Sequence, residues 1–459
     1  MKKLRFLSIF LVGALLTGLL STTAVAAPEG TFEKINVDAK AALLVDADTG
    51  QVLLDQNANQ QLYPASITKC MTTLLVLKAI DQGKLSLNQT ITASQSAIDM
   101  LTSDSSSVGT KVGEQLTVEQ LLYCVMVASA NEACYILAEA VSGSVDAFVA
   151  EMNAEAKRLG CKNTNYVNPC GLHDPDHYTS AWDIYLVTKE AMKHSLFMTL
   201  ASTTTYKIPA TNMSEARTLH TTNFLLDNWR KTGYRYSYAK GIKTGHTSDA
   251  GYCLASYAEK GKRSLISVVL GAERIEKNGE DIYKSFSETK RLFEWGFSSF
   301  NRTKILDHAA LVEEVPVTLS RKTNYVSVHP AADVEVLLPS NVKVEDLEQK
   351  IQLDAESVQA PITEGQKLGT ITISDKDGTV YTTSALLASN EVPASTLLTI
   401  LYKLKVFFSN PIVKIVSVLL AAALLLLIVK VIRRRPKRYR GGQSYRTRHR
   451  NQHYHGRRR

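Results

Sequence analysis

The apolar residues between positions 30 and 300 occur both as short continuous runs and at helical spacing. Residues 41–55 hold two apolar runs around the polar stretch 46–50, a pattern that predicts a hairpin of two buried strands. Residues 66–80 follow a proline and have the apolar spacing of a helix. Thr117 and Gln120 form a capping box at the start of another helix. Further elements are predicted as helices at residues 117–126, 132–141 and 281–295, and as a strand at 264–271. Strands at both ends of a helical middle predict an α+β domain.

After Asp307 the pattern changes to short segments in which apolar and polar residues alternate, which is typical of strands with one buried face. The sequence Asp-Lys-Asp-Gly at residues 375–378 predicts a hairpin turn between the last two strands. The six strands are predicted at residues 312–317, 325–328, 333–338, 350–353, 368–374 and 379–383. A small β sandwich or barrel is therefore expected after the α+β domain.

The N-terminal residues have the three parts of a secretory signal peptide. A basic cluster at residues 2–5 precedes an apolar run at 6–20, and small residues end in Ala-Val-Ala at 24–26. We expect cleavage near Ala26. An uncleaved signal anchor is the alternative, and it would leave the topology of the chain unchanged.

Near the other end, residues 411–432 are apolar except for Lys414, Ser417 and Lys430. As a helix they would be about 33 Å long, which is enough to cross a hydrocarbon core of roughly 30 Å, and the two lysines could reach the interfaces. The tail at residues 433–459 holds 12 Lys or Arg and no Asp or Glu. The positive-inside rule therefore predicts a cytoplasmic tail and extracytoplasmic domains before the helix. A helix lying in the membrane plane is disfavoured because the run has no polar face.

Composition and charge exclude several classes of protein. With 45% hydrophobic and 21% charged residues among 459, the chain can bury several cores and is not a disordered or collagen-like polymer. The net charge is +9, but without the 12 charges of the tail and three near the N-terminus the remainder carries −6. A wholly basic nucleic-acid-binding domain is therefore excluded. For the tail, anionic membrane lipid is favoured over nucleic acid as the partner.

Candidate chemistry lies in three short motifs. Ser66 is placed at a predicted helix start, at the positive end of the macrodipole, and Lys69 lies one turn along on the same face. This placement suits a nucleophile beside its base. The third motif lies on or just before the first strand of a predicted hairpin. The motifs are Ser66-Ile67-Thr68-Lys69, Ser129-Ala130-Asn131 and Lys243-Thr244-Gly245.

The chain also contains copies of these motifs in less suitable places. Ser287 and Lys290 lie inside a predicted helix that has its own apolar face, so solvated residues are the simpler interpretation. Residues 231–233 repeat the third motif in a predicted loop. The other copies are Ser237 with Lys240, and Ser86-Leu87-Asn88.

With their neighbourhoods, the three motifs resemble the low-molecular-weight penicillin-binding proteins, the serine D-alanyl-D-alanine carboxypeptidases of the peptidase S11 family. Identity, order and rough spacing match over about residues 35–300, and residues 361–374 resemble the β-rich domain that follows in this family. Cys170 departs from the family pattern, where a His or another residue is expected. The neighbouring segments that match are residues 46–50, 63–66, 168–172 and 241–247. The resemblance implies a penicillin-binding/β-lactamase-like transpeptidase domain, in which helices surround an antiparallel sheet, followed by a small all-β domain.

The resemblance also implies a role for each motif. Ser66 would attack the carbonyl between two terminal D-alanines of the peptidoglycan stem peptide and form an acyl-enzyme that water hydrolyses. Lys69 would be the base, which requires its pKa to fall from about 10.4 to near neutrality through burial and the charge of Lys243. Ser129 would pass a proton to the leaving amine, and the backbone N–H groups of Ser66 and His246 would form the oxyanion hole. The implied substrate-binding residues are Asn131 for the substrate amide, Lys243 and Thr244 for the terminal carboxylate, Gly245 and His246.

Two further groups of residues could carry chemistry. Residues 173–177 include two His, but Pro175 breaks helical spacing, so a polar loop is favoured over a metal site and no metal or cofactor is expected. The six cysteines are even in number and expected outside the cell, where disulfides are permitted. Cys161 with Cys170 is the pair that most merits a test. Apolar positions typical of buried thiols hold the other four, Cys70, Cys124, Cys134 and Cys253.

We therefore expect a single-pass protein of the bacterial cell membrane that removes the terminal D-alanine from stem pentapeptides and is inhibited by β-lactams. A class A-like β-lactamase is an alternative, but no Glu-x-x-Leu-Asn lies between the second and third motifs. A non-enzymatic cell-wall-binding protein on the same scaffold is a third possibility, which the intact motifs disfavour. The expected organisation is a signal peptide at 1–26, a catalytic domain at 27–306, a β-rich domain at 307–390, a linker at 391–410, a transmembrane helix at 411–432 and a basic cytoplasmic tail at 433–459.

Overall fold

A computed structural model describes residues 35–433 of the chain. The expected signal peptide and all but the first residue of the basic tail lie outside the described residues. The described chain divides into two compact units, which are treated separately below. The first contains the N-terminal domain together with residues 328–355 and 367–387, and the second contains residues 314–327, 356–366 and 388 onward.

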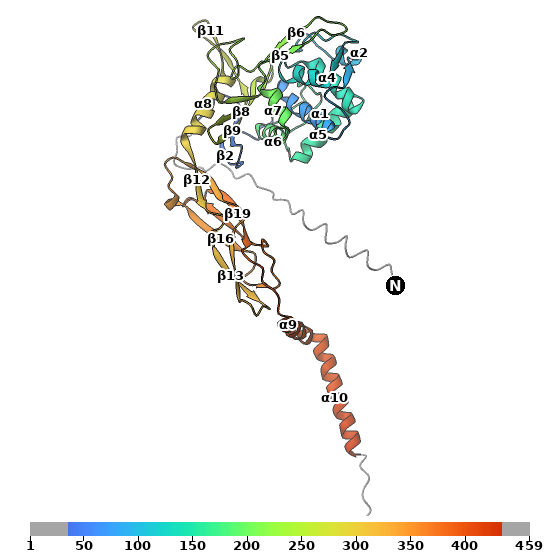
Figure 1. The fold of residues 1–459 in the computed structure, drawn as a ribbon, viewed down its shortest axis with the longest axis vertical. Helices are drawn as coiled ribbons and strands as arrows, with labels where there is room; N and C mark the ends of the chain where they lie inside the picture. Colours follow the sequence, from blue (N-terminus) through green and yellow to red (C-terminus); the bar gives the residue numbers. More distant parts are fainter. Residues whose placement is uncertain (1–34, 434–459) are drawn as a thin grey trace, which may run out of the picture. The chain divides into compact units, whose positions relative to one another are not determined.

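The N-terminal domain is built on a five-stranded antiparallel sheet in the order β2-β1-β9-β8-β7 (Figure 1). The predicted hairpin of buried strands and the predicted strand near residue 264 are confirmed in β1, β2 and β9. β7 forms one edge of the sheet, so one side of its backbone is free to pair with another chain. The strands are β1 (Ala41–Asp46), β2 (Val52–Gln56), β7 (Ala239–Thr247), β8 (Gly251–Lys260) and β9 (Arg263–Ala272).

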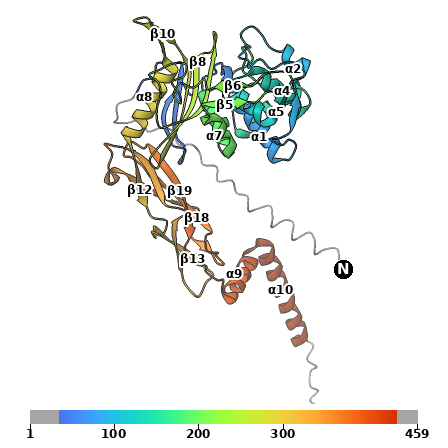
Figure 2. The same cartoon turned by 45° about the horizontal axis from the view of Figure 1, so that its top comes forward.

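Helices cover both faces of this sheet, because its strands are apolar on both sides (Figure 2). In β1, Leu43 and Val45 pack into a core shared with the helical region, whereas Leu44 packs into a second core under helix α8 (Lys284–Ser299). Alternate residues of a strand point to opposite faces, so one run of apolar residues serves two cores. The helical region comprises η1 (Ala65–Thr68), α1 (Lys69–Asp81), α2 (Gln95–Asp99), α3 (Val118–Met126), α4 (Asn131–Ser142), α5 (Val145–Leu159), α6 (Ala181–Ala191) and α7 (Ser195–Ser202).

Local signals in the sequence set several boundaries. The predicted capping box of Thr117 and Gln120 is confirmed, with both reciprocal hydrogen bonds present. The helix predicted to begin at Asp281 begins instead at Lys284, and the prediction was wrong there. Asn278 and Gly279, both at positive φ, form the tight turn of a hairpin that pairs residues 281–283 as a strand. The three small hairpins or strand pairs are β3 (Thr90–Thr92) with β4 (Gln115–Thr117), β5 (Thr205–Ile208) with β6 (Arg217–His220), and β10 (Arg274–Lys277) with β11 (Glu280–Tyr283).

The chain after α8 is rich in strands, as predicted. All six predicted strands are present, and the turn at residues 375–378 joins the last two of them. The sequence prediction missed β12 (Phe300–Leu306), which pairs with β15 in the first unit. In the second unit, β13 and β17 pair in parallel. The remaining elements are β13 (Glu313–Thr318), β14 (Tyr325–Pro330), β15 (Val334–Pro339), η2 (Val344–Asp346), β16 (Glu348–Leu353), β17 (Val358–Gln359), β18 (Lys367–Ser374) and β19 (Val380–Ala388).

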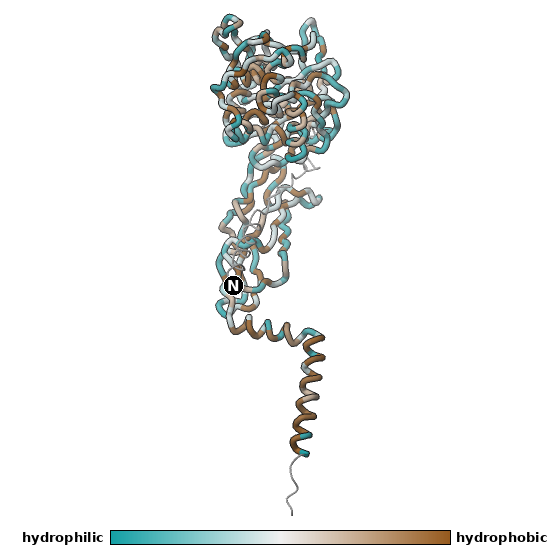
Figure 3. Tube along the Cα trace, turned by 90° about the vertical axis from the view of Figure 1, so that its right-hand side faces the viewer, coloured by the Kyte–Doolittle hydropathy of each residue, from teal (hydrophilic) through white to brown (hydrophobic). Residues whose placement is uncertain are grey.

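Two helices end the described chain. The segment expected to be a linker contains helix α9 (Thr396–Ser409), which the side chain of Ser395 caps by accepting a hydrogen bond from the Leu398 N–H. Helix α10 (Pro411–Arg433) coincides with the predicted transmembrane segment, and Figure 3 shows its almost continuous hydrophobic colouring. Its 23 residues are long and apolar enough for one membrane crossing.

Candidate active site

The turn before α1 places the first motif. Pro64 precedes η1, Ala65 has a positive φ of 47°, and Ser66 follows half-buried within this 3₁₀ turn. Lys69 is the first residue of α1, and its Nζ lies 2.8 Å from Ser66 Oγ. The sequence prediction placed Ser66 at the start of an α-helix. The tighter turn observed instead still leaves Ser66 and Lys69 on the same face.

Lys69 is fully buried among oxygen atoms. Besides Ser66 Oγ, its Nζ contacts Asn131 Oδ1 and the carbonyl oxygen of Cys170, each at 2.8 Å. An uncharged amine has two N–H groups and one lone pair. If the two N–H groups donate to Asn131 and Cys170, the lone pair is directed at the hydroxyl of Ser66, which is the geometry that a general base requires.

The second motif lies where the chain turns from α3 into α4. Ser129 has a positive φ of 62°, uncommon for a residue other than glycine, and Asn131 begins α4. The buried carboxylate of Glu132 accepts hydrogen bonds from Ser107 Oγ and the Val108 N–H, both at 2.8 Å. These bonds fix a neighbouring loop against the start of α4 and so hold Asn131 in place.

The third motif lies on β7, which is the first strand of a hairpin with β8, as predicted, and which forms an edge of the sheet. Lys243 is buried, and its Nζ donates to Ser129 Oγ at 3.0 Å and to the Thr244 carbonyl at 3.1 Å. Burial, assisted by the positive charge of Lys69, lowers the pKa of Lys243 from 10.5 to about 7.

Gly245 allows β7 to approach the turn that contains Ser66. A Cβ at this position would lie 2.8 Å from the Pro64 carbonyl oxygen and 3.1 Å from the backbone nitrogen of Ser66. The next residue, His246, stacks on Tyr252 with ring centroids 4.1 Å apart. Partial burial and the charge of Arg274 lower the pKa of the His246 imidazole. The absence of a side chain at Gly245 therefore places two backbone segments, at Ser66 and at His246, next to each other.

The structure thus brings together the three motifs named from the sequence. It also adds residues that the sequence prediction missed. Thr222 Oγ1 lies 2.6 Å from Thr244 Oγ1, and the carbonyl of Cys170 contacts Lys69. A backbone carbonyl has no sequence signal of its own, but the matching segment at residues 168–172 pointed to this part of the chain.

A buried histidine supports the turn that contains Ser66. The prediction treated residues 173–177 as a polar loop, yet His177 is only 2% exposed and its Nε2 lies 2.8 Å from Thr68 Oγ1. Its Nδ1 accepts from the Val167 N–H, so Nε2 carries the proton and donates to Thr68. Burial lowers the pKa of His177 to about 4. Residues 173–177 form a loop, as predicted, and His177 is a buried structural residue within it.

The cysteines form no disulfides within residues 35–433, and the two duplicate motifs described below do not form a second site. All six cysteines are free thiols, so the Cys161–Cys170 pair considered from the sequence is not formed, and the four predicted buried thiols are buried. Ser287 lies within α8 and donates to the Lys284 carbonyl, and residues 231–233 lie in a loop. The sequence interpretation of both duplicates is therefore supported.

Among residues 35–433, the group with spacing suitable for a metal ion is formed by Asp307, His308 and Asp333, which are all exposed. Lys304 Nζ lies 2.6 Å from Asp307 and 2.7 Å from Asp333, so an ammonium already neutralises these carboxylates. None of the residues of the three motifs belongs to this group.

The arrangement combines the hydroxyl of Ser66 with the buried Lys69 beside it, a hydrogen bond between Lys243 and Ser129, and the free edge of β7. These are the parts of a serine acyl-transfer enzyme of the kind that the three-motif penicillin-binding proteins use. The family described as D-alanyl-D-alanine carboxypeptidase, peptidase S11, matches residues 23–274, and the C-terminal domain of penicillin-binding protein 5 matches residues 300–394. The chain belongs to the peptidase S11 family of D-alanyl-D-alanine carboxypeptidases.

Related carboxypeptidases can be aligned with most of the chain. It is 31% identical to the D-alanyl-D-alanine carboxypeptidase DacF of Bacillus subtilis over 398 residues, which is 86% of this chain and 97% of that protein. It is 31% identical to the carboxypeptidase DacA of Escherichia coli K12, with 78% and 84% covered. The crystal structure of penicillin-binding protein 5 from Haemophilus influenzae aligns with a TM-score of 0.66 at 30% identity, covering 79% of this chain and all of that one. The transpeptidase-type fold and the following all-β domain expected from the sequence are thereby confirmed.

Proposed function

We propose that this carboxypeptidase is anchored in the membrane, that it removes the terminal D-alanine from peptidoglycan stem pentapeptides through an acyl-enzyme on Ser66, and that penicillin acylates the same serine. The observation that carries the proposal is the 2.8 Å contact between Lys69 Nζ and Ser66 Oγ inside a buried cluster. The relatives named above are D-alanyl-D-alanine carboxypeptidases, which supports the reaction class.

In the first half of the reaction, uncharged Lys69 takes the proton of Ser66 as its oxygen attacks the carbonyl between the two D-alanines. The backbone N–H groups of Ser66 and His246 donate to the developing oxyanion, where one such donor is worth roughly 3 to 4 kcal/mol. Ser129 passes its proton to the leaving amine and regains one from Lys243, which donates a hydrogen bond to it. Free D-alanine leaves, and water then attacks the acyl-enzyme.

The ends of the substrate are held by the second and third motifs. Asn131 would contact a substrate amide, and Lys243 with Thr244 would bind the terminal carboxylate. Thr222, which contacts Thr244 at 2.6 Å, extends this carboxylate site by one hydroxyl. A site that binds a free carboxylate beside the reactive serine selects the end of a peptide chain, which is why the proposed reaction removes a single residue.

Release of D-alanine from a synthetic pentapeptide tests this chemistry. Ser66→Ala should reduce turnover by a factor on the order of 10⁶, as the loss of a serine nucleophile does in related mechanisms, whereas Ser287→Ala should leave it unchanged. Fluorescent penicillin should give a long-lived adduct with the wild-type protein. Rapid hydrolysis of the drug would favour a β-lactamase, and normal D-alanine release by Ser66→Ala would refute the proposal.

The anchor is proposed to be α10, with the basic tail at residues 433–459 in the cytoplasm and the catalytic domain outside. A helix of 23 residues is about 34 Å long, which matches a hydrocarbon core of roughly 30 Å, and Lys414 and Lys430 lie near its ends. Removal of residues 433–459 tests the orientation. Protease accessibility on the outer face should fall if the tail sets the topology, and unchanged accessibility would contradict that role.

A further inference from the structure

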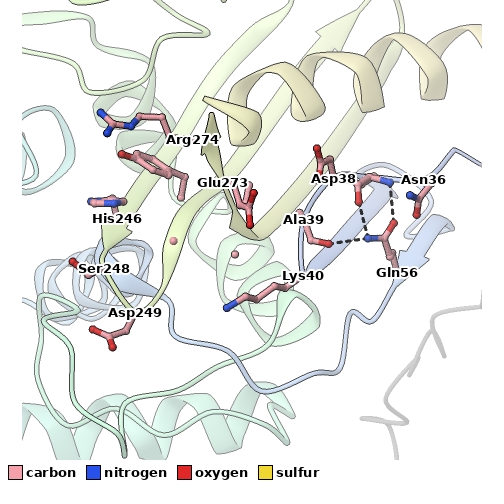
Figure 4. Close-up of a pocket in the computed structure, with 15 residues that line it drawn as sticks. Asn36, Asp38, Ala39, Lys40, Gln56, His246, Ser248, Asp249, Glu273 and Arg274 are labelled. Atoms are coloured by element: carbon pink, nitrogen blue, oxygen red, sulfur yellow. Dashed lines mark hydrogen bonds between the residues drawn. The ribbon is translucent and has the colours of Figure 1, made fainter. Parts of the chain in front are cut away.

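A large polar cavity opens beside the candidate active site. Its volume is about 1190 Å³, and it lies where β7 and β9 end and where β1 and β8 begin (Figure 4). His246, the residue proposed to complete the oxyanion hole, is part of its wall. A site of this size is much larger than the reacting dipeptide needs, and no step of the proposed mechanism uses it.

The cavity is lined by charges of both signs. Figure 4 shows Lys40 pointing towards Asp249, and Glu273 lies between the end of β9 and the start of β10, next to Arg274. Arg274 forms an exposed ion pair with Asp281 at 3.4 Å, and Asp249 lies 3.8 Å from His173. Across residues 35–433, neither Lys40 nor Glu273 has an ion-pair partner within 4 Å. The cavity therefore presents one cation and one anion that are both available to a ligand.

The side chain of Lys40 lies against a glycine. A Cβ at Gly271 would lie 2.7 to 2.9 Å from three carbons of the Lys40 side chain, so the aliphatic stem of Lys40 lies directly over Gly271. Gly271 also has a positive φ of 67°, which favours glycine at that position. The contact between the aliphatic carbons of Lys40 and Gly271 therefore directs the Lys40 ammonium group into the cavity.

The direction of the peptide substrate leads towards this cavity. In the proposed mechanism the terminal carboxylate lies at Lys243 and Thr244, and the reacting carbonyl lies at the His246 N–H. A peptide paired with the free edge of β7 therefore runs antiparallel to it, and its upstream residues pass beyond His246 towards Ser248 and Asp249. Each extended residue spans about 3.3 Å, so the residue before the D-alanine pair reaches the cavity.

We propose that this cavity binds the side chain of the residue that precedes the two D-alanines, and that it selects a side chain bearing both an ammonium and a carboxylate group. The ammonium would pair with Asp249 and Glu273, and the carboxylate with Lys40 and Arg274. A side chain with a single charge would leave one of the two unpaired groups, Lys40 or Glu273, without a partner. The inference rests on the proposed function, because it takes the substrate direction from it.

Three tripeptides of the form N-acetyl-X-D-Ala-D-Ala test the inference with the full-length protein. X is diaminopimelate, which has both groups, lysine, which has the ammonium alone, or norleucine, which has neither. We expect kcat/KM for D-alanine release to be about tenfold higher with diaminopimelate than with norleucine, which is the effect of two partly exposed ion pairs together, and intermediate with lysine.

Two variants locate the effect in the cavity. Because Asp249 and Arg274 remain, Glu273→Gln should reduce the advantage of lysine over norleucine, and Lys40→Met should reduce the advantage of diaminopimelate over lysine. The matched controls are Glu276→Gln and Lys277→Met on β10, which are exposed and outside the cavity lining, and they should leave both ratios unchanged. Equal kcat/KM for the three peptides, or ratios that the cavity variants do not change, would overturn the inference.

The acylation rate with fluorescent penicillin separates this inference from the chemistry on which it rests. The acyl side chain of penicillin lies upstream of its reacting carbonyl but carries neither an ammonium nor a carboxylate group, so the cavity variants should be acylated at the wild-type rate. If the wild-type protein is acylated and releases D-alanine but does not discriminate among the peptides, the cavity proposal alone fails. If it does neither, the proposed function fails and the cavity proposal fails with it.

Discussion

The close approach of β7 to the turn that contains Ser66 makes Gly245→Ala an informative substitution. The new Cβ would lie 2.8 Å from the Pro64 carbonyl oxygen and 3.1 Å from Ser66 N, and it cannot avoid them because both are backbone atoms. Relief of the contact requires a shift of about 0.5 Å between the two segments, given ordinary carbon–oxygen contacts of about 3.3 Å or more. The shift moves His246 away from Ser66.

A shift of about 0.5 Å is as large as the range of donor–oxyanion distances that the proposed oxyanion hole can tolerate. Its donors must lie about 2.7 to 3.1 Å from the oxyanion, and the loss of one donor costs roughly 10² to 10³ in rate. We therefore expect Gly245→Ala to reduce the rate of acylation by fluorescent penicillin about 10²-fold. The same overpacking should cost about 1 to 3 kcal/mol of stability.

A second glycine provides the control. Gly369 lies in β18, and a Cβ there would be 2.7 Å from the Gln352 carbonyl oxygen, so Gly369→Ala introduces a comparable backbone clash away from the three motifs. Acylation rates and urea unfolding should be measured for both variants. Gly369→Ala should lose stability but keep the wild-type acylation rate. If Gly245→Ala also keeps that rate, or if both variants slow equally, the assignment of Gly245 and His246 to the oxyanion hole is wrong.

Three further predictions concern buried charges and use urea unfolding. The pKa of Lys243 is lowered to about 7, so the folded protein binds fewer protons than the unfolded chain between pH 7 and 10.5. The free energy of unfolding of the wild type should therefore rise with pH across this range relative to that of Lys243→Met. Parallel curves for the two proteins would contradict this prediction. The pKa of His177 is lowered to about 4, so the wild type should lose stability as pH falls from 6.5 to 4, and His177→Gln should lack this loss. Glu114 is fully buried and pairs with Arg217 at 2.7 Å, so Glu114→Gln should cost about 3 to 5 kcal/mol, whereas Asp281→Asn in an exposed pair should have no measurable effect; equal effects would refute the argument.

Much of the fold could be predicted because its signals are local. The continuous apolar runs of β1 and β9 arise from burial on both faces, and the capping box at Thr117 marks a helix start through two specific hydrogen bonds. β12 was missed because its seven residues follow α8 directly, without a turn signal between them. The start of α8 was misplaced because the hairpin signal of Asn278 and Gly279 was not used.

For the candidate site, the side chains could be predicted from the sequence, but the contacts that surround them could not. The three motifs were found by residue identity and context, and their convergence depends on long-range packing between α1, α4 and β7. The carbonyl of Cys170 reaches Lys69 through backbone geometry, which no residue type encodes. The structural role of His177 within its loop could not be predicted because its partner, Thr68, is 109 positions away. A hydrogen bond across such a distance leaves no periodic pattern.

The most direct test of the central claim is to identify the residue that carries the acyl group. The full-length protein should be incubated with benzylpenicillin, digested and analysed by mass spectrometry, with Lys69→Met treated in parallel. We predict a single penicilloyl adduct on the peptide that contains Ser66, and its loss in Lys69→Met although Ser66 is still present. An adduct on any other serine, Ser129 included, or undiminished labelling of Ser66 without Lys69, would contradict the account.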